Sequence, residues 1–91
     1  MAGYYSQDML TALELSRRGW QRVIVRDDFS VIQEQISWCY GSFGRRYGDR
    51  DPETFCIEGE WFGARLTFTT GTETVLMFPP ANYSLYRLRW G

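Results

Sequence analysis

Residues 29–43 have the sequence FSVIQEQISWCYGSF, and this stretch decides the fold. Its apolar residues recur every three or four positions, so on a helix they fall within one arc of about 100°. Ser30 and Gln33 have the spacing of a capping box at the start of a helix, and Gly44 is placed to end it. The pattern predicts an amphipathic helix with a buried stripe of Phe29, Ile32, Ile36, Cys39, Tyr40 and Phe43.

Two further helices are predicted, one at each end of the chain. The first covers Gln7–Arg18, with Ser6 as N-cap, an apolar arc on one side and Gly19 as terminator. Residues 81–91 offer Asn82 as a cap but also alternate apolar and arginine residues as a strand does. We favour a short helix for this segment.

Strands are predicted where apolar residues alternate with polar ones or run continuously. Pro79-Pro80 ends the last of them. The expected strands are residues 20–26, 54–58, 65–69 and 75–78.

The predicted order of elements is α-β-α-β-β-β-α, which defines an α+β fold. We expect one globular domain over residues 1–91, because a chain of this length builds a single core. Its predicted architecture is a small antiparallel sheet of three to four strands, with two helices on one face and a short C-terminal helix.

Val31 and Trp38 lie outside the main stripe of the helix at 29–43 and project from nearly the same side. Either the amino-terminal helix packs there, or the two residues form a partner site. We favour packing by the amino-terminal helix, because two helices on one face of a small sheet must touch each other.

All ten basic residues are arginine, and the chain has neither lysine nor histidine. The composition excludes imidazole bases, histidine-activated nucleophiles and Schiff-base lysines, so we expect no enzyme. The net charge of −1 disfavours general affinity for a polyanion such as DNA. No apolar run is long enough to span a bilayer, and the prediction is a cytoplasmic protein without a membrane partner.

The remaining reactive side chains are expected to be structural. Cys39 and Cys56 are predicted to be reduced, buried thiols. A calcium loop over Asp49, Asp51, Glu53 and Glu60 fails because Thr54 occupies the place of its glycine, and we expect neither metal nor cofactor. Glu58 and Glu60 are interpreted as the outward side of a strand and not as an acid/base pair.

Arginine and aromatic residues supply the candidate binding surfaces. The segment Arg45-Arg46-Tyr47-Gly48-Asp49-Arg50 resembles surfaces that stack single-stranded nucleic acid, although its acidic neighbours can neutralise the arginines. Sixteen aromatic residues exceed what a small core needs, and Trp, Tyr and Arg dominate binding hot spots. The candidate partner contacts are Trp38, Arg45, Arg46, Tyr47, Arg50, Trp61, Tyr86, Arg87, Arg89 and Trp90.

Three stretches carry a resemblance to a known group of proteins: Trp38-Cys39, Phe43-Gly44-Arg45-Arg46 and Tyr86-Arg87-Leu88-Arg89-Trp90. In these the chain resembles short bacteriophage accessory proteins of unknown function, which carry an aromatic-Gly-x-Arg stretch and a terminal aromatic-x-Leu-Arg-Trp. Pro79-Pro80 and Tyr83 depart from that pattern. The resemblance implies a phage origin and carries no activity with it.

The leading hypothesis is a phage-encoded accessory protein that binds and modulates a host or phage protein without catalysis. One alternative is a virion component, such as a decoration or connector subunit, in which the aromatics form a repeating homo-oligomeric interface. A single-stranded nucleic-acid binder is a further alternative, disfavoured by the net charge.

Overall fold

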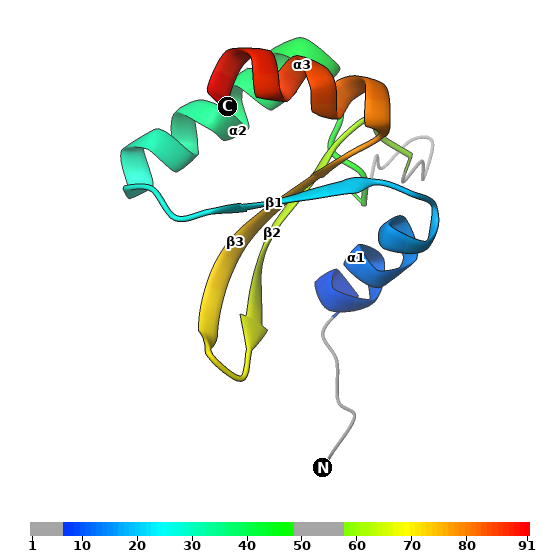
Figure 1. The fold of residues 1–91 in the computed structure, drawn as a ribbon, viewed down its shortest axis with the longest axis vertical. Helices are drawn as coiled ribbons and strands as arrows, with labels where there is room; N and C mark the ends of the chain where they lie inside the picture. The colour runs from blue at the N-terminus through cyan, green and yellow to red at the C-terminus, as the bar shows by residue number, and fades with distance from the viewer. Residues whose placement is uncertain (1–6, 49–57) are drawn as a thin grey trace, which may run out of the picture.

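The computed structural model describes residues 7–48 and 58–91, which form helices on both sides of a small sheet (Figure 1). The elements follow the order α-β-α-β-β-α, and the α+β class is confirmed. Residues 54–57 of the predicted second strand lie outside the described residues. The elements are α1 (Gln7–Arg17), β1 (Gln21–Val25), α2 (Phe29–Phe43), β2 (Phe62–Phe68), β3 (Gly71–Phe78) and α3 (Pro80–Trp90).

Glycines end the first two helices as predicted, but the start of α2 differs from the prediction. Gly19 and Gly44 have φ values of 87° and 81°, a region that favours glycine. The N-cap of α2 is Asp28, without a side-chain cap hydrogen bond, and Ser30 lies inside the helix. The predicted capping box is therefore wrong, because the helix begins one residue before Ser30.

The C-terminal segment is the helix α3, so the favoured interpretation of residues 81–91 is confirmed. Pro80 occupies the first turn, where the missing N–H costs no hydrogen bond. Asn82 does not cap the helix: its side-chain amide donates to the Glu60 carbonyl at 2.9 Å. The cap prediction was wrong because Pro79 begins the helix earlier.

The sheet is antiparallel with the strand order β1-β3-β2, so β3 is the central strand. Every residue from Thr74 to Phe78 is buried. A central strand covered on both faces has no polar side, which explains the continuous apolar run Val75-Leu76-Met77-Phe78.

Each face of the sheet has its own hydrophobic cluster. On one face α1 places Ala12 and Leu15 among buried residues of β2 and β3. On the opposite face α2 and α3 cover the sheet with Cys39 and Tyr86 at the centre of the cluster. Figure 1 shows α1 on one side of the strands and α2 beside α3 on the other.

The predicted position of the amino-terminal helix is therefore wrong. Two helices do share one face, but they are α2 and α3, while α1 covers the other face. The reason lies in β3, where Val75 and Met77 point to α1 and Leu76 and Phe78 point to α2 and α3. Both faces are apolar, so both need a helix.

Candidate functional site

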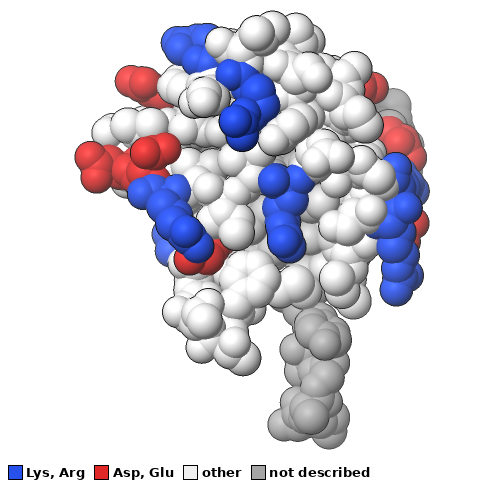
Figure 2. Space-filling model, viewed as in Figure 1, with Lys and Arg blue, Asp and Glu red and all other residues white. Residues whose placement is uncertain are grey.

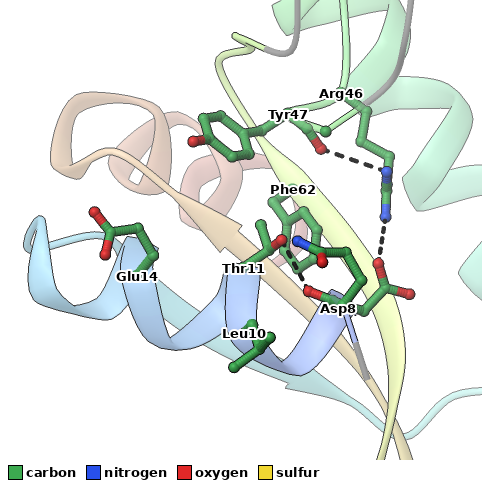
Figure 3. Close-up of a pocket in the computed structure, with 9 residues that line it drawn as sticks. Asp8, Leu10, Thr11, Glu14, Arg46, Tyr47 and Phe62 are labelled. Carbon is green, nitrogen blue, oxygen red and sulfur yellow. Dashed lines mark hydrogen bonds and ion pairs between the residues drawn. The ribbon is translucent and has the colours of Figure 1, made fainter. Parts of the chain in front are cut away.

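A hollow of about 430 Å³ separates α1 from the segment after α2 (Figure 3). Gln7, Asp8, Leu10, Thr11 and Glu14 line it from α1. Arg46, Tyr47, Gly48 and Phe62 line the opposite side.

Arg46 is the central side chain of this hollow and is bound on several sides. Its Nε donates to the Gly63 carbonyl at 2.7 Å, and its Nη2 lies 3.6 Å from the Asp8 carboxylate. The guanidinium carbon is 4.8 Å from the centre of the Phe62 ring. Glu14 is paired with Arg18 at 3.6 Å. The charges of the hollow compensate one another, so Arg46 acts as a clamp between α1 and β2.

The arginine-rich segment after α2 does not present its aromatic residue to solvent. Tyr47 is 8% exposed, packs edge-to-face with Trp20 at 5.8 Å, and lies 5.6 Å from the Arg18 guanidinium carbon. Arg45 is exposed, and Arg50 lies outside the described residues. The Tyr47 ring therefore offers little exposed surface on which a nucleotide base could stack.

Trp61 is also a core residue, so the prediction that it contacts a partner is wrong. It is 1% exposed, and its indole N–H donates to the Gly44 carbonyl at 2.9 Å. Its ring packs edge-to-face against Tyr40 at 4.9 Å. Nearby, Gly59 approaches the Tyr47 backbone so closely that a Cβ would not fit.

Trp38 lies between α2 and α3 and connects their aromatic side chains. Its ring is 5.2 Å from that of Phe43 and 6.3 Å from each of Tyr86 and Trp90, always edge-to-face. The residues that pack on Trp38 from another helix therefore come from α3 and not from α1.

Alanine at position 38 is expected to lower the free energy of unfolding by about 2–4 kcal/mol, since Trp38 is partly buried among three aromatic rings. Chemical denaturation measures the change. Leu88→Ala is the control: Leu88 is 85% exposed, and its replacement is expected to shift stability by less than about 0.5 kcal/mol. Equal stabilities for the two variants would show that Trp38 is not a core residue.

Two titratable groups beneath this aromatic layer are held neutral. Burial raises the pKa of the Cys39 thiol from 9.0 to about 12, which disfavours the thiolate that a nucleophile requires. Burial, with smaller contributions from the charges of Cys39 and Asp27, raises the pKa of Tyr86 to about 12. The Tyr86 hydroxyl donates to Gln35 Oε1, and Gln35 Nε2 donates to Asp27 at 3.3 Å.

The prediction that Cys39 is a free and buried thiol is confirmed. Cys56 lies outside the described residues, so the same prediction for that residue stays a prediction.

The end of α3 carries exposed arginines beside tryptophan. The Arg89 guanidinium carbon lies 4.3 Å from the centre of the Trp90 ring, and Arg87 donates to the Tyr83 hydroxyl at 3.4 Å. Figure 2 shows blue side chains over this end of the molecule, above the strands. We call Trp38, Arg87, Arg89 and Trp90 the C-terminal surface.

A hollow of about 370 Å³ opens on the C-terminal surface, between Trp38, Arg89 and Trp90 and the polar side of α2. The Trp90 indole N–H is buried and has no acceptor among the described residues. A buried donor without an acceptor costs about 1–3 kcal/mol in the folded protein.

The structure brings together five of the ten candidate contacts and places four others elsewhere, while Arg50 lies outside the described residues. Trp38, Tyr86, Arg87, Arg89 and Trp90 meet where α2 and α3 adjoin, although Tyr86 is buried beneath the others. Arg45, Arg46, Tyr47 and Trp61 belong to the segment beside β2.

Two surfaces of the structure were not predicted from the sequence. One is an exposed apolar strip on the outside of α3, formed by Leu85 and Leu88, and the signal was a helix with more apolar positions than one face can bury. The other is a hollow of about 350 Å³ along β1. No sequence signal pointed to it, because a hollow depends on where distant elements end.

Within residues 7–48 and 58–91, no helix is both long and apolar enough to cross a membrane. The same residues contain no cluster of three cysteine, aspartate or glutamate side chains placed to hold a metal ion. Comparison of the chain with protein-family models, curated proteins and solved structures gives no match. Function is therefore inferred from the residues of this chain alone.

Proposed function

We propose that this protein is a non-catalytic binding module that recognises another protein through its C-terminal surface. The observation that carries the proposal is Trp90, a partly exposed tryptophan whose ring lies 4.3 Å from the Arg89 guanidinium carbon beside a hollow of about 370 Å³. Tryptophan and arginine next to a hollow are the residue types that supply most binding energy in protein interfaces.

The resemblance of Tyr86-Arg87-Leu88-Arg89-Trp90 to the ends of short bacteriophage accessory proteins supports a phage origin. It also supports a target among phage or host proteins, in the cytoplasm of the host. Four of these five residues are exposed or partly exposed, which is what a contact segment requires.

The test is affinity capture from the lysate of a bacterial host with the protein as bait. A partner that is captured by the wild type, lost with Trp90→Ala or Arg89→Ala, and retained with Arg17→Ala supports the proposal. Arg17 is an exposed arginine of α1 and serves as the matched control. Equal capture by all variants would contradict the role of the C-terminal surface.

Trp90→Phe provides a sharper comparison, because it removes the unpaired N–H and keeps an aromatic ring. We expect the free energy of unfolding not to fall, because removing a buried donor without an acceptor offsets the loss of ring area. We expect partner binding to weaken by about tenfold, because the smaller ring contacts less of the partner. The same change at Trp61 removes a satisfied hydrogen bond and is expected to cost about 1 kcal/mol or more in stability. A larger stability loss at position 90 than at position 61 would indicate a structural role for Trp90.

The exposed strip of Leu85 and Leu88 favours a second candidate function, a subunit of a virion assembly. Apolar side chains on the outside of a helix are typical of an interface between copies. Sedimentation distinguishes the two: an assembly subunit gains mass with concentration and loses that gain in Leu88→Glu, whereas a binding module stays monomeric.

A further inference from the structure

The outer edge of β1 pairs with no other strand of the described sheet, because the strand order is β1-β3-β2 and β1 is an end strand. In Figure 1 β1 is the strand nearest the viewer, and no described segment crosses in front of it. An unpaired edge presents a row of backbone N–H and C=O groups that another strand can bind.

The opposite edge of the sheet is covered by the segment after α2. The Tyr47 N–H donates to the Trp61 carbonyl at 2.6 Å, and Arg46 Nε donates to the Gly63 carbonyl at 2.7 Å. The carbonyl of Gly63 therefore points away from β3.

This contact fixes which groups of β1 face outward. Backbone groups alternate in direction along a strand, and paired residues of an antiparallel ladder either both face each other or both face away. Because Gly63 faces away from its partner Leu76, Leu76 turns its N–H and C=O toward Val23 of β1. Val23 is thus bonded inside the sheet, and the N–H and C=O of Arg22 and Ile24 point outward.

A hollow of about 350 Å³ runs beside this edge and provides room for side chains of an added strand. Val23, Ile24 and Val25 form its strand side. Gln35 and Tyr86 contribute from the buried layer, and Arg87 and Trp90 contribute from the end of α3. A strand on β1 would place alternate side chains in this hollow.

The charge around the edge selects the kind of strand. Arg22 and Arg87 are exposed and form no ion pair with the described residues, whereas Arg26 is paired with Glu73 at 3.4 Å. Asp27, at one end of the hollow, accepts a hydrogen bond from Gln35. Figure 2, which views the molecule from the β1 side, shows blue side chains across the face and red ones mainly near its margins.

We propose that the outer edge of β1 binds an extended, acidic peptide segment of a partner protein by strand addition. The peptide backbone pairs with Arg22 and Ile24, and its acidic side chains meet Arg22 and Arg87. This inference rests on the proposed function and names the binding mode: main-chain hydrogen bonds supply affinity, and the hollow and arginines supply specificity.

The probe is a yeast-displayed library of random decapeptides selected against the full chain. We expect enriched peptides with net negative charge and alternating apolar residues. Residue-resolved amide exchange with the best peptide is expected to slow at Arg22 and Ile24 by about tenfold or more, with Val23 little changed because its N–H is already paired. Enrichment of basic or neutral peptides, protection elsewhere, or no enrichment would overturn the proposal.

Two variants test the edge directly. Arg22→Glu is expected to weaken binding of the acidic peptide by about tenfold. Arg65→Glu, at an exposed arginine on the opposite edge strand, is the control and is expected to leave the affinity unchanged. Ile24→Pro removes an outward N–H, which an edge strand tolerates, and is expected to abolish binding while circular dichroism stays native. If Ile24→Pro fails to fold, amide exchange on the wild-type protein still tests whether the peptide pairs with β1.

Failure of this inference is distinguishable from failure of the proposed function. A natural partner that is lost with Trp90→Ala but retained with Arg22→Glu leaves the proposed function standing and overturns the edge as its binding site. If Trp90→Ala captures the same lysate proteins as the wild type, the proposed function is contradicted. The peptide selection then still tests whether the outer edge of β1 binds an acidic strand.

Discussion

Replacing Trp61 with alanine is expected to lower the free energy of unfolding by about 3–5 kcal/mol, the range for deletion of a large buried aromatic side chain. Trp61 is 1% exposed and joins the end of α2 to the start of β2 through Gly44 and Tyr40. Alanine leaves a cavity and an unpaired Gly44 carbonyl at the same time. Since small domains have total stabilities of about 5–15 kcal/mol, this variant loses a large share of its stability.

Thermal and chemical denaturation followed by circular dichroism measures this loss. Tyr83→Ala is a useful control, because Tyr83 is a partly exposed aromatic residue of α3. Its hydroxyl accepts a hydrogen bond from exposed Arg87 at 3.4 Å. We expect Tyr83→Ala to cost clearly less than Trp61→Ala. Similar losses of unfolding free energy in the two variants would mean that the contacts of Trp61 between α2 and β2 do not stabilise the fold.

Alkaline pH is expected to destabilise the protein strongly between about pH 9 and pH 12. In the folded state the pKa of Cys39 is raised from 9.0 to about 12 and that of Tyr86 from 10.0 to about 12, mainly by burial. A raised pKa means that the folded protein holds its proton more tightly than the unfolded chain. The resulting stability is complete below about pH 9 and is lost as the pH rises through 12.

Denaturation at pH 7, 9, 10 and 11 tests this expectation. Cys39→Ala removes one of the two groups, so the fall in stability between pH 9 and 11 is expected to become smaller in this variant, even though its stability at pH 7 is reduced. Tyr86→Phe removes the other group and leaves Gln35 Oε1 without its donor. A wild type whose stability is unchanged up to pH 11 would contradict the burial of both groups.

Slow reaction of Cys39 with a thiol reagent at pH 8 provides an independent check. The buried thiol is protonated at that pH, and the thiolate is the reactive form. We expect modification of Cys39 to become fast only under denaturing conditions. Rapid modification of Cys39 in the native protein would show that α2 does not bury its central stripe.

The sequence by itself determined the local elements. The helix α2, the glycine that ends it and the apolar run of β3 depend only on spacing along the chain, so these elements and the α+β class followed from periodicity. The burial of Cys39 followed for the same reason, since it lies in the middle of the apolar stripe of α2. The predicted buried stripe of α2 was wrong at Phe29 and Tyr40, which are 73% and 45% exposed. Both lie at the same margin of the apolar arc, where a helix turns from its core side toward solvent.

Only the tertiary structure decided which surfaces meet. Periodicity states that a residue faces a core, but it does not state which face of the sheet supplies that core, and β3 is apolar on both. That is why α1 lies opposite α2, and why α3 and not α1 covers Trp38. The burial of Tyr47 and Trp61 and the place of β1 at the end of the described sheet likewise arise from contacts between segments far apart in the chain, which no local pattern encodes.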